Sequence, residues 1–135
     1  MDRLTAERRS FLMSQVRSKN TSPELAVRRT LHALGYRYRL HGGDLPGTPD
    51  LVFPARHKVI FVHGCYWHGH TCRFGLAQSK SNQAFWQRKL AATRERDARS
   101  ALALTKCGWA VHTIWECEIK ANSWLDAALS FLQRP

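Results

Sequence analysis

The sequence predicts an α/β domain in which a mixed central sheet is covered by helices on both faces. Three short apolar stretches, residues 51–53, 59–62 and 109–115, have the length of strands, and segments with helix signals precede, separate and follow them. Elements in this order are typical of a sheet packed between helices. At 135 residues the chain can build one core, so we expect residues 1–135 to form a single domain.

The first helix is predicted to begin with Ser22 as its N-cap, to carry Pro23 and Glu24 in its first turn, and to end at Gly35. Its apolar face consists of Val27, Leu31 and Leu34. Residues 36–40 then alternate tyrosine or leucine with arginine, which predicts a strand with one buried face and one basic face.

The apolar stretches 51–53 and 59–62 flank a turn that begins with proline, which predicts a hairpin of adjacent strands. A long helix follows, capped by Ser81 or Asn82 and ending at Gly108. Its apolar residues are Phe85, Trp86, Leu90, Leu102 and Leu104. Ser123 is predicted to cap the closing helix. The residues of that helix that we expect to face inward are Trp124, Leu125, Ala128, Leu129 and Leu132.

The chain carries a large positive charge. Lysine and arginine number 21 against 10 acidic residues, a formal net charge of +11, and such a surplus favours a polyanionic partner, nucleic acid first. An anionic membrane surface is the alternative, but no apolar run approaches the roughly 18 residues of a spanning helix. Residues 1–20 form a basic N-terminal arm, which we expect either to be helical or to become ordered on DNA.

The N-terminus lacks the apolar core of a signal peptide, so we expect a cytoplasmic protein, associated with the DNA of a bacterial nucleoid. In a reducing compartment the four cysteines are expected to be metal ligands or buried thiols rather than disulfides.

Residues 61–72, directly after a predicted strand, hold three histidines and two cysteines. Cys65, His70 and Cys72 with Cys117 from the end of the last strand can form a closed, structural zinc site. The alternative is a set of ordinary buried thiols and loop histidines, because the spacing is not that of a standard zinc finger. The spacing also does not choose the imidazole ligand among the three histidines. Cys107 is expected to be a small core residue.

A second group of residues suits a hard cation. The predicted hairpin brings the Asp50 carboxylate beside the Val62 carbonyl and the His63 ring, and magnesium prefers such oxygen ligands. Proline followed by aspartate is also a common turn dipeptide, which is the plainer interpretation of Asp50. Glu24 and Asp97 are further candidate acids. The alternative for both is a solvated role, in which Glu24 favours the helix dipole and Asp97 balances the charge of Arg96 and Arg99.

Three aromatic residues, Tyr66, Trp67 and Trp86, lie near predicted loops and basic residues rather than at core spacing. Exposed rings beside lysine and arginine can stack on bases or wedge between them. The alternative is that all five tryptophans fill the core. Trp109, Trp115 and Trp124 have the spacing of core residues.

With these residues assembled, the chain resembles the very short patch repair (Vsr) endonucleases over nearly its whole length. The matching segments, in family order, are residues 17–25 (RSKNTSPEL), 44–50 (DLPGTPD), 60–72 (IFVHGCYWHGHTC), 85–86 (FW), 94–97 (RERD) and 114–117 (IWEC). The resemblance implies a restriction-endonuclease-like fold with a structural zinc site. It also implies an enzyme that nicks duplex DNA on the 5′ side of the thymine in a T·G mismatch, the product of 5-methylcytosine deamination.

The resemblance further implies a role for each site residue. Asp50 and the Val62 carbonyl would hold Mg²⁺, and Glu24 and His63 would hold metal-bound water or phosphate. His68 would be the general base with Asp97 behind it. The structural Zn²⁺ would use Cys65, His70, Cys72 and Cys117. The DNA contacts would be Tyr66, Trp67 and Trp86 as a major-groove wedge, Met13 in the minor groove, and Lys89 in base reading.

Two positions depart from the family pattern: Val62, where threonine is common, and Thr93, where asparagine is common. The family implies a monomer acting on duplex DNA and contact with a MutL-type mismatch-repair protein. Two rival functions remain: a restriction or homing-type nuclease that cuts matched duplex, and a non-enzymatic zinc-containing DNA-binding module.

Overall fold

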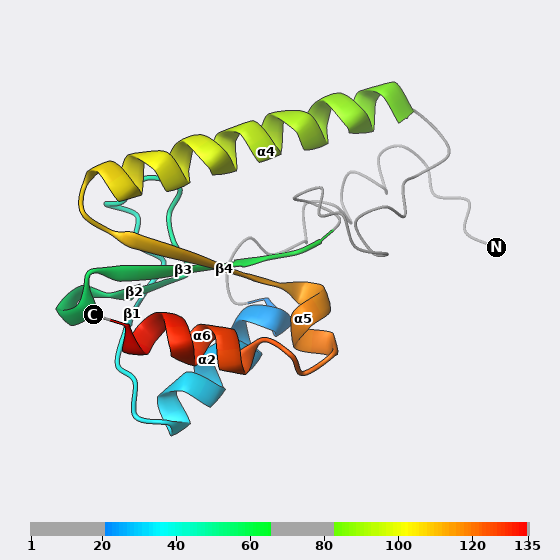
Figure 1. The fold of residues 1–135 in the computed structure, drawn as a ribbon. Helices are drawn as coiled ribbons and strands as arrows, with labels where there is room; N and C mark the ends of the chain where they lie inside the picture. The colour runs from blue at the N-terminus through cyan, green and yellow to red at the C-terminus, as the bar shows by residue number, and fades with distance from the viewer. Residues whose placement is uncertain (1–20, 66–82, 135) are drawn as a thin grey trace.

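The computed structural model describes residues 21–65 and 83–134 and contains the predicted mixed sheet with flanking helices (Figure 1). The sheet has the order β1-β2-β3-β4, formed by β1 (Arg39–Leu40), β2 (Leu51–Phe53), β3 (Lys58–His63) and β4 (Ala110–Trp115). β2 pairs antiparallel with both β1 and β3, whereas β3 pairs parallel with β4. The short helix η1 (Pro54–Arg56) closes the predicted β2–β3 hairpin.

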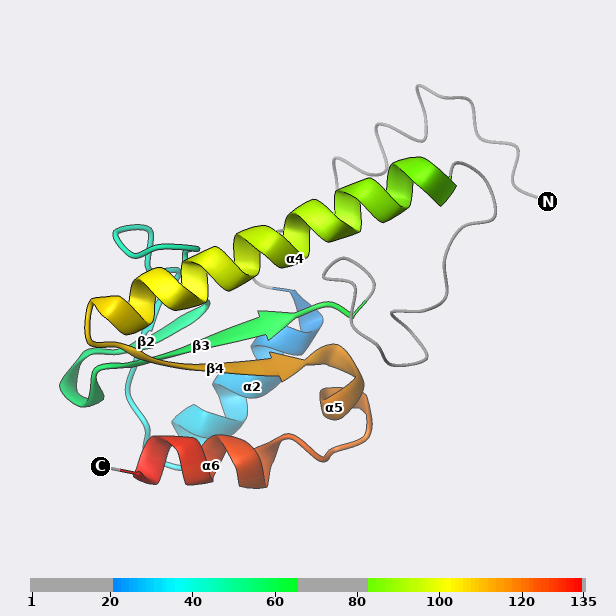
Figure 2. The same ribbon diagram turned by 45° about the horizontal axis from the view of Figure 1, so that its top comes forward.

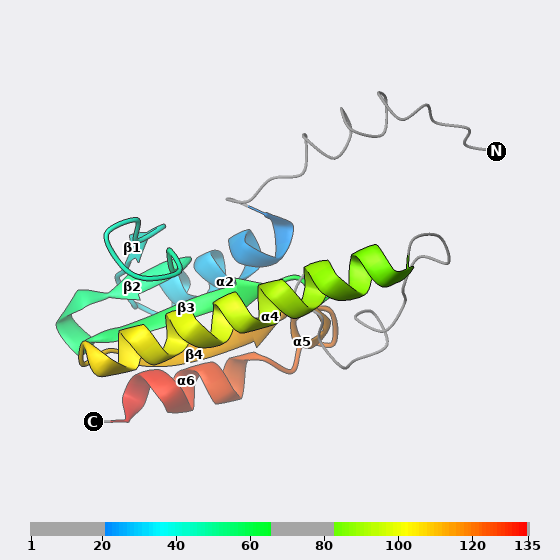
Figure 3. The ribbon, with the colours of Figure 1, turned by 90° about the horizontal axis from the view of Figure 1, so that it is seen from above.

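Helices cover both faces of the sheet. α4 (Gln83–Lys106) lies across one face, and α2 (Ser22–Ala33), α5 (Glu116–Lys120) and α6 (Leu125–Gln133) lie on the other (Figures 1 and 3). Along residues 21–65 and 83–134, every helix is too short or too polar to cross a bilayer.

Alternating residues of β2 and β3 point to opposite faces and so build two cores. Leu51, Phe53 and Ile60 join the larger cluster with α2 and α6, while Val52, Val59 and Phe61 join the cluster under α4. The remaining buried members of the larger cluster are Val27, Leu31, Ile114, Trp124, Ala128, Phe131 and Leu132. Trp124 is therefore a core residue as predicted, and Trp109 packs half-buried against the smaller cluster.

One stripe of α4 faces the sheet. Buried or half-buried residues recur along this stripe every three or four positions, at Trp86, Leu90, Thr93, Asp97, Ser100 and Leu104, and the small Ala101 and Ala103 beside it are also half-buried. Phe85 and Leu102 lie off this stripe and are 51% and 55% exposed. The prediction for Cys107 was wrong: the thiol is exposed, because α4 ends at Lys106 and the chain turns away at Gly108 with φ 89°.

The element boundaries differ from the predictions in several places. Thr21, not Ser22, caps α2 and accepts a hydrogen bond from the Glu24 amide at 3.3 Å. The helix ends at Ala33, so Leu34 is exposed rather than in the core. Of residues 36–40, only Arg39–Leu40 pair as a strand.

The end of the chain also differs from the prediction. The chain continues from β4 straight into α5, which the sequence did not predict. Trp124 occupies the N-cap position of α6 without a side-chain cap, and the predicted cap Ser123 instead contacts the Glu118 carbonyl at 3.4 Å.

The C-terminal end of α6 is fastened to the first residue of β3. The buried Lys58 ammonium donates to the carbonyls of Phe131, Leu132 and Arg134, and Arg56 Nη1 donates to the Leu132 carbonyl at 3.1 Å. A helix leaves its last carbonyls without partners inside the helix, and a cation is a favourable partner for them. Lys58 therefore serves the fold and is not available to a polyanionic partner.

Replacing Lys58 by methionine should lower the free energy of unfolding by about 2 kcal/mol, because buried carbonyls then lose their donor. Urea unfolding followed by circular dichroism measures the change. Lys120→Met is the matched control, since Lys120 is exposed and its ion pair with Glu116 spans 3.9 Å; its effect should stay within about 0.5 kcal/mol. Equal losses in the two variants would contradict the role of Lys58 in fastening α6 to β3.

Candidate active site

Several of the predicted site residues gather at the carboxyl end of β3. β3 and β4 run in the same direction, and the first turn of α2 lies beside the end of β3 (Figures 2 and 3). The loop that precedes β2 reaches the same end of β3, because β2 runs antiparallel to β3. Three segments far apart in the sequence therefore meet at one edge.

Asp50 enters this edge one residue before β2. Its Oδ2 accepts a hydrogen bond from the Val62 amide at 2.7 Å, which fixes the carboxylate against β3. In an antiparallel pair the amide and the carbonyl of one residue point to the same neighbouring strand, so the Val62 carbonyl also projects toward the Asp50 side. The hairpin thus places the carboxylate beside the Val62 main chain, as the sequence predicted.

The loop that carries Asp50 has a special backbone. Thr48 has φ 49° and Gly47 has φ 75°. A Cβ at residue 47 would lie 2.7 Å from the Ser100 Cβ on α4, so only glycine allows this close approach. The contact ties the loop to the inward stripe of α4.

Glu24 approaches Asp50 from the first turn of α2. Its side chain is 1% exposed, and its Oε2 lies 3.2 Å from Arg28 Nη1 and 3.0 Å from His41 Nε2. A buried carboxylate needs such partners to offset its loss of hydration. The Thr21 cap and the helix N-terminus add favourable dipoles for a negative charge there.

The two acids influence each other. The pKa of Asp50 is raised from 3.8 to about 7: burial contributes most, the charge of Glu24 and a hydrogen bond with it add to the rise, and the hydrogen bond from Val62 opposes it. Two carboxyls this close cannot both ionise without cost. The pair is therefore a strong candidate for binding a cation.

His63 ends β3 and is 8% exposed. Phe61 belongs to the cluster under α4, so His63, two residues further along the strand, faces the same side. Its ring lies 5.5 Å from the ring of Phe61 and 5.2 Å, edge to face, from the ring of Trp115. Aromatic neighbours on two sides fix the orientation of the imidazole.

Two of the four predicted zinc ligands meet beyond the ends of β3 and β4. The parallel register pairs His63 with Trp115, so Cys65 and Cys117 follow at matching positions. The Cys117 amide donates to Cys65 Sγ at 3.3 Å, and Cys65 is fully buried. The Cys117 main chain therefore lies against the buried Cys65 thiol, while the other two predicted ligands, His70 and Cys72, lie outside the described residues.

α4 contributes Asp97, Trp86 and Lys89. Asp97 is half-buried on the inward stripe, one turn before Ser100. Near the start of the helix, Lys89 Nζ lies 5.5 Å from the centre of the Trp86 ring, and Phe85 meets Trp86 edge to face at 5.6 Å. This end of α4 projects past the sheet, on the side where β3 ends (Figures 1, 2 and 3).

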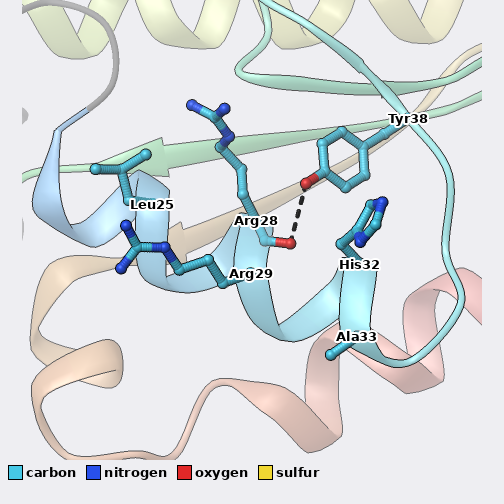
Figure 4. A pocket seen from close by; sticks show the side chains of 6 residues that line it. All are labelled: Leu25, Arg28, Arg29, His32, Ala33 and Tyr38. Carbon is cyan, nitrogen blue, oxygen red and sulfur yellow. Dashed lines mark hydrogen bonds between the residues drawn. The ribbon is translucent and has the colours of Figure 1, made fainter.

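A basic pocket of about 490 Å³ adjoins the site on α2 (Figure 4). It is lined by Leu25, Arg28, Arg29, His32, Ala33 and Tyr38. The Tyr38 hydroxyl donates to the Arg28 carbonyl at 3.0 Å, which fixes one wall (Figure 4). Because Arg28 also contacts Glu24, one side chain connects the pocket with the acidic pair.

The remaining predicted site residues lie outside the described residues: Met13, Tyr66, Trp67, His68, His70 and Cys72. Within residues 21–65 and 83–134, no three histidine, cysteine or acidic side chains form a metal-binding group. The sequence missed His41 and Arg28 as partners of Glu24. The spacing of four residues from Glu24 to Arg28 on one helix predicts an ion pair between them, whereas nothing local in the sequence connects Glu24 with His41.

Several known proteins are similar to this chain. The family model described as DNA mismatch endonuclease Vsr matches residues 1–74. The Type II nicking enzyme V.XorIIP of Xanthomonas oryzae pv. oryzae is 54% identical over 134 residues, 99% of this chain and 98% of the relative. The Type II nicking enzyme V.NmeAIP of Neisseria meningitidis is 42% identical over 98% of this chain and 94% of its own length. The DNA mismatch endonuclease Vsr of Escherichia coli is 34% identical over 123 residues, which are 90% of this chain and 78% of the relative.

The raised pKa of Asp50 predicts how stability depends on pH. Between 3.8 and about 7 the folded chain holds a proton that the unfolded chain has released, so the free energy of unfolding falls as pH rises through this window. Asp50→Asn stays neutral and avoids this loss. In metal-free buffer at about pH 8 it should exceed the wild type by up to about 4 kcal/mol, and the two should converge near pH 4.

Urea unfolding of both proteins at each pH measures the difference, and comparison at one pH cancels the titration of other groups. Asp126→Asn, at an exposed position of α6, should follow the wild type throughout. A constant difference between Asp50→Asn and the wild type from pH 4 to pH 8 would contradict the raised pKa.

Proposed function

The chain belongs to the Vsr family of DNA mismatch endonucleases, and we propose that it nicks one strand of duplex DNA on the 5′ side of the thymine in a T·G mismatch. The observation that carries this proposal is the convergence of Glu24 and Asp50 at the end of β3, beside the Val62 main chain. A +11 chain supplies the charge for a polyanionic substrate.

The chemistry of the acidic pair fits Mg²⁺. Hard cations prefer carboxylate and carbonyl oxygens, and a cation would offset the burial and the nearby Glu24 charge that together raise the pKa of Asp50. Asp50 and the Val62 carbonyl would hold the ion, and Glu24 and His63 would hold water or a phosphate oxygen. When bound, Mg²⁺ supplies positive charge to the phosphate and lowers the pKa of water.

The remaining chemistry requires a base and an oriented water. We assign the base to His68, which would take a proton from the water that attacks phosphorus, and the orientation of His68 to Asp97. The P–O bond opposite the attacking water would break, and its strand oxygen would leave with a proton from solvent water. Asp97 is suited to this role because it is half-buried on the stripe of α4 that faces the sheet. Its own backbone is fixed by the helix, so its carboxylate can hold a partner in one position.

DNA recognition is assigned to the projecting end of α4 and to the segments around it. Trp86, supported by Lys89 and Phe85, would form the wedge with Tyr66 and Trp67, and Met13 would reach the minor groove. A mismatched pair unstacks at lower cost than a matched pair, which would direct the wedge to damage. The basic pocket on α2 offers a place for a backbone phosphate.

The alternative is a nicking enzyme that cuts matched duplex. Two of the three relatives described above are named as Type II nicking enzymes, and such names do not mention a mismatch. The acidic pair would serve both reactions equally, because it acts on the phosphate. The choice between them depends on the residues that contact the bases.

A nicking assay decides among these functions. Three end-labelled substrates are compared: a duplex with a T·G pair, the matched duplex, and the single strands. Each is incubated with Mg²⁺ or with a chelator. We expect one cut in the thymine strand of the T·G duplex, with Mg²⁺ only. Asp50→Asn should lose at least about 100-fold in rate while its DNA affinity stays within about threefold.

Asp44→Asn is the matched control, an exposed carboxyl in the same loop whose ion pair with Arg39 spans 3.6 Å; it should nick like the wild type. Equal cutting of matched duplex would replace the mismatch proposal with the alternative. Salt-sensitive binding without any cleavage would identify a DNA-binding module instead.

We also propose a structural Zn²⁺ held by Cys65, His70, Cys72 and Cys117. The support is the contact between the Cys117 amide and Cys65 Sγ, which joins a buried thiol to a second cysteine across two strand ends. Four such ligands close the coordination of zinc, so the ion would fasten the segment after β3 to α5. That segment carries His68, so the zinc site would also position the base.

Metal analysis tests the zinc site. The purified wild type should retain about one zinc ion per chain after Mg²⁺ is removed, and Cys117→Ser should lose the ion together with thermal stability. Cys107→Ser is the control, since Cys107 is exposed at the far end of α4 and should retain the zinc. A fully folded wild type without zinc would refute the site.

A further inference from the structure

His41 has an unusual backbone for a residue that is not glycine. It follows β1 with φ 52°, in the left-handed region. The His41 amide donates to the Asp50 carbonyl at 3.0 Å, and the His41 carbonyl accepts from the Gly43 amide at 2.7 Å. Residues in this conformation persist where their surroundings fix them, and they concentrate at functional sites.

The side chain of His41 reaches the buried acid. His41 Nε2 lies 3.0 Å from Glu24 Oε2, across 17 residues of sequence and between two elements, the turn after β1 and helix α2. An ionised carboxylate only accepts hydrogen bonds, so with Glu24 in that form Nε2 carries the proton and donates it. The imidazole is half-buried, with 16% of its side chain exposed, which protects this contact from competing water.

One residue thus contacts both acids of the site, Asp50 through its main chain and Glu24 through its ring. Arg28 Nη1 contacts the same Oε2 from within α2 at 3.2 Å. A carboxylate is planar, so donors that hold Oε2 from two directions also fix the direction of Oε1. Arg28 moves with α2, whereas His41 fixes Glu24 relative to the sheet.

We propose that His41 is a positioning residue, which holds the Glu24 carboxylate at the angle that it needs beside Asp50 for binding the catalytic cation. This inference rests on the proposed nuclease function and adds to it a residue outside the metal-binding set. Arg28 alone can balance the charge of Glu24, so the specific contribution of His41 is orientation. Loss of a hydrogen-bonding partner behind a metal-binding group commonly weakens metal affinity or activity by about 10- to 100-fold.

The test compares glycine and glutamine at this position. His41→Gly removes the ring while glycine adopts φ 52° without strain, so the variant should fold. His41→Gln retains an N–H donor at a similar distance from Cα. His57→Gly is the matched control, since His57 is an exposed histidine with φ 54° in the β2–β3 hairpin.

Two measurements are made on each protein: the single-turnover rate of nicking on T·G duplex, and the Mg²⁺ concentration that gives half of the metal-induced rise in unfolding temperature. His41→Gly should nick about 10-fold or more slowly and require several-fold more Mg²⁺, with unchanged DNA affinity in chelator. His41→Gln should recover most of both losses. His57→Gly should match the wild type.

A wild-type Mg²⁺ requirement in His41→Gly would overturn the proposal, and so would equal losses in the glycine and glutamine variants. The unfolding measurement separates this result from a failure of the proposed function. If the wild type did not nick T·G duplex, the mismatch proposal would fail, while the Mg²⁺ dependence of unfolding would still decide the role of His41.

Discussion

The parallel pairing of β3 with β4 is the contact on which the rest of this structure depends. Its six residue pairs, from Lys58 with Ala110 to His63 with Trp115, bring two strands to the same edge of the sheet. The edge holds the histidine at the end of β3 and the cysteines that follow both strands. At the opposite end of β3, Lys58 fastens the closing helix. β3 is therefore fixed at both ends, and it is the strand against which Asp50 is held.

The site works against the stability of the fold that supports it. A half-buried Asp50 next to a buried Glu24 is unfavourable when both are charged, and the surrounding donors from Val62, Arg28 and His41 only partly offset this. Natural sites commonly accept such a cost where a ligand removes it. An acidic pair of this kind is more informative about function than a solvated pair, because no requirement of folding explains it.

The sequence predicted those parts of the site that depend on local periodicity. The hairpin of residues 51–53 and 59–62, and with it the approach of Asp50 to Val62, followed from two apolar stretches around a turn. Contacts that depend on tertiary geometry were not predictable. The ring of His41 reaches Glu24 through a left-handed turn, and the exposure of Cys107 depends on where α4 ends. Thr21 and Ser22 are both good caps, so only the structure could choose between them.

The exposed thiol at Cys107 has a practical use. It lies just past the C-terminal end of α4, whose 24 residues span about 36 Å, and the other end of this helix carries Trp86. Cys65 is fully buried, so a maleimide dye would react with Cys107 far more readily than with that thiol. A dye at this position would sit a full helix length from the projecting end of α4. That spacing suits energy transfer to a second dye on an oligonucleotide, and it would report binding without a tag on either end of the chain.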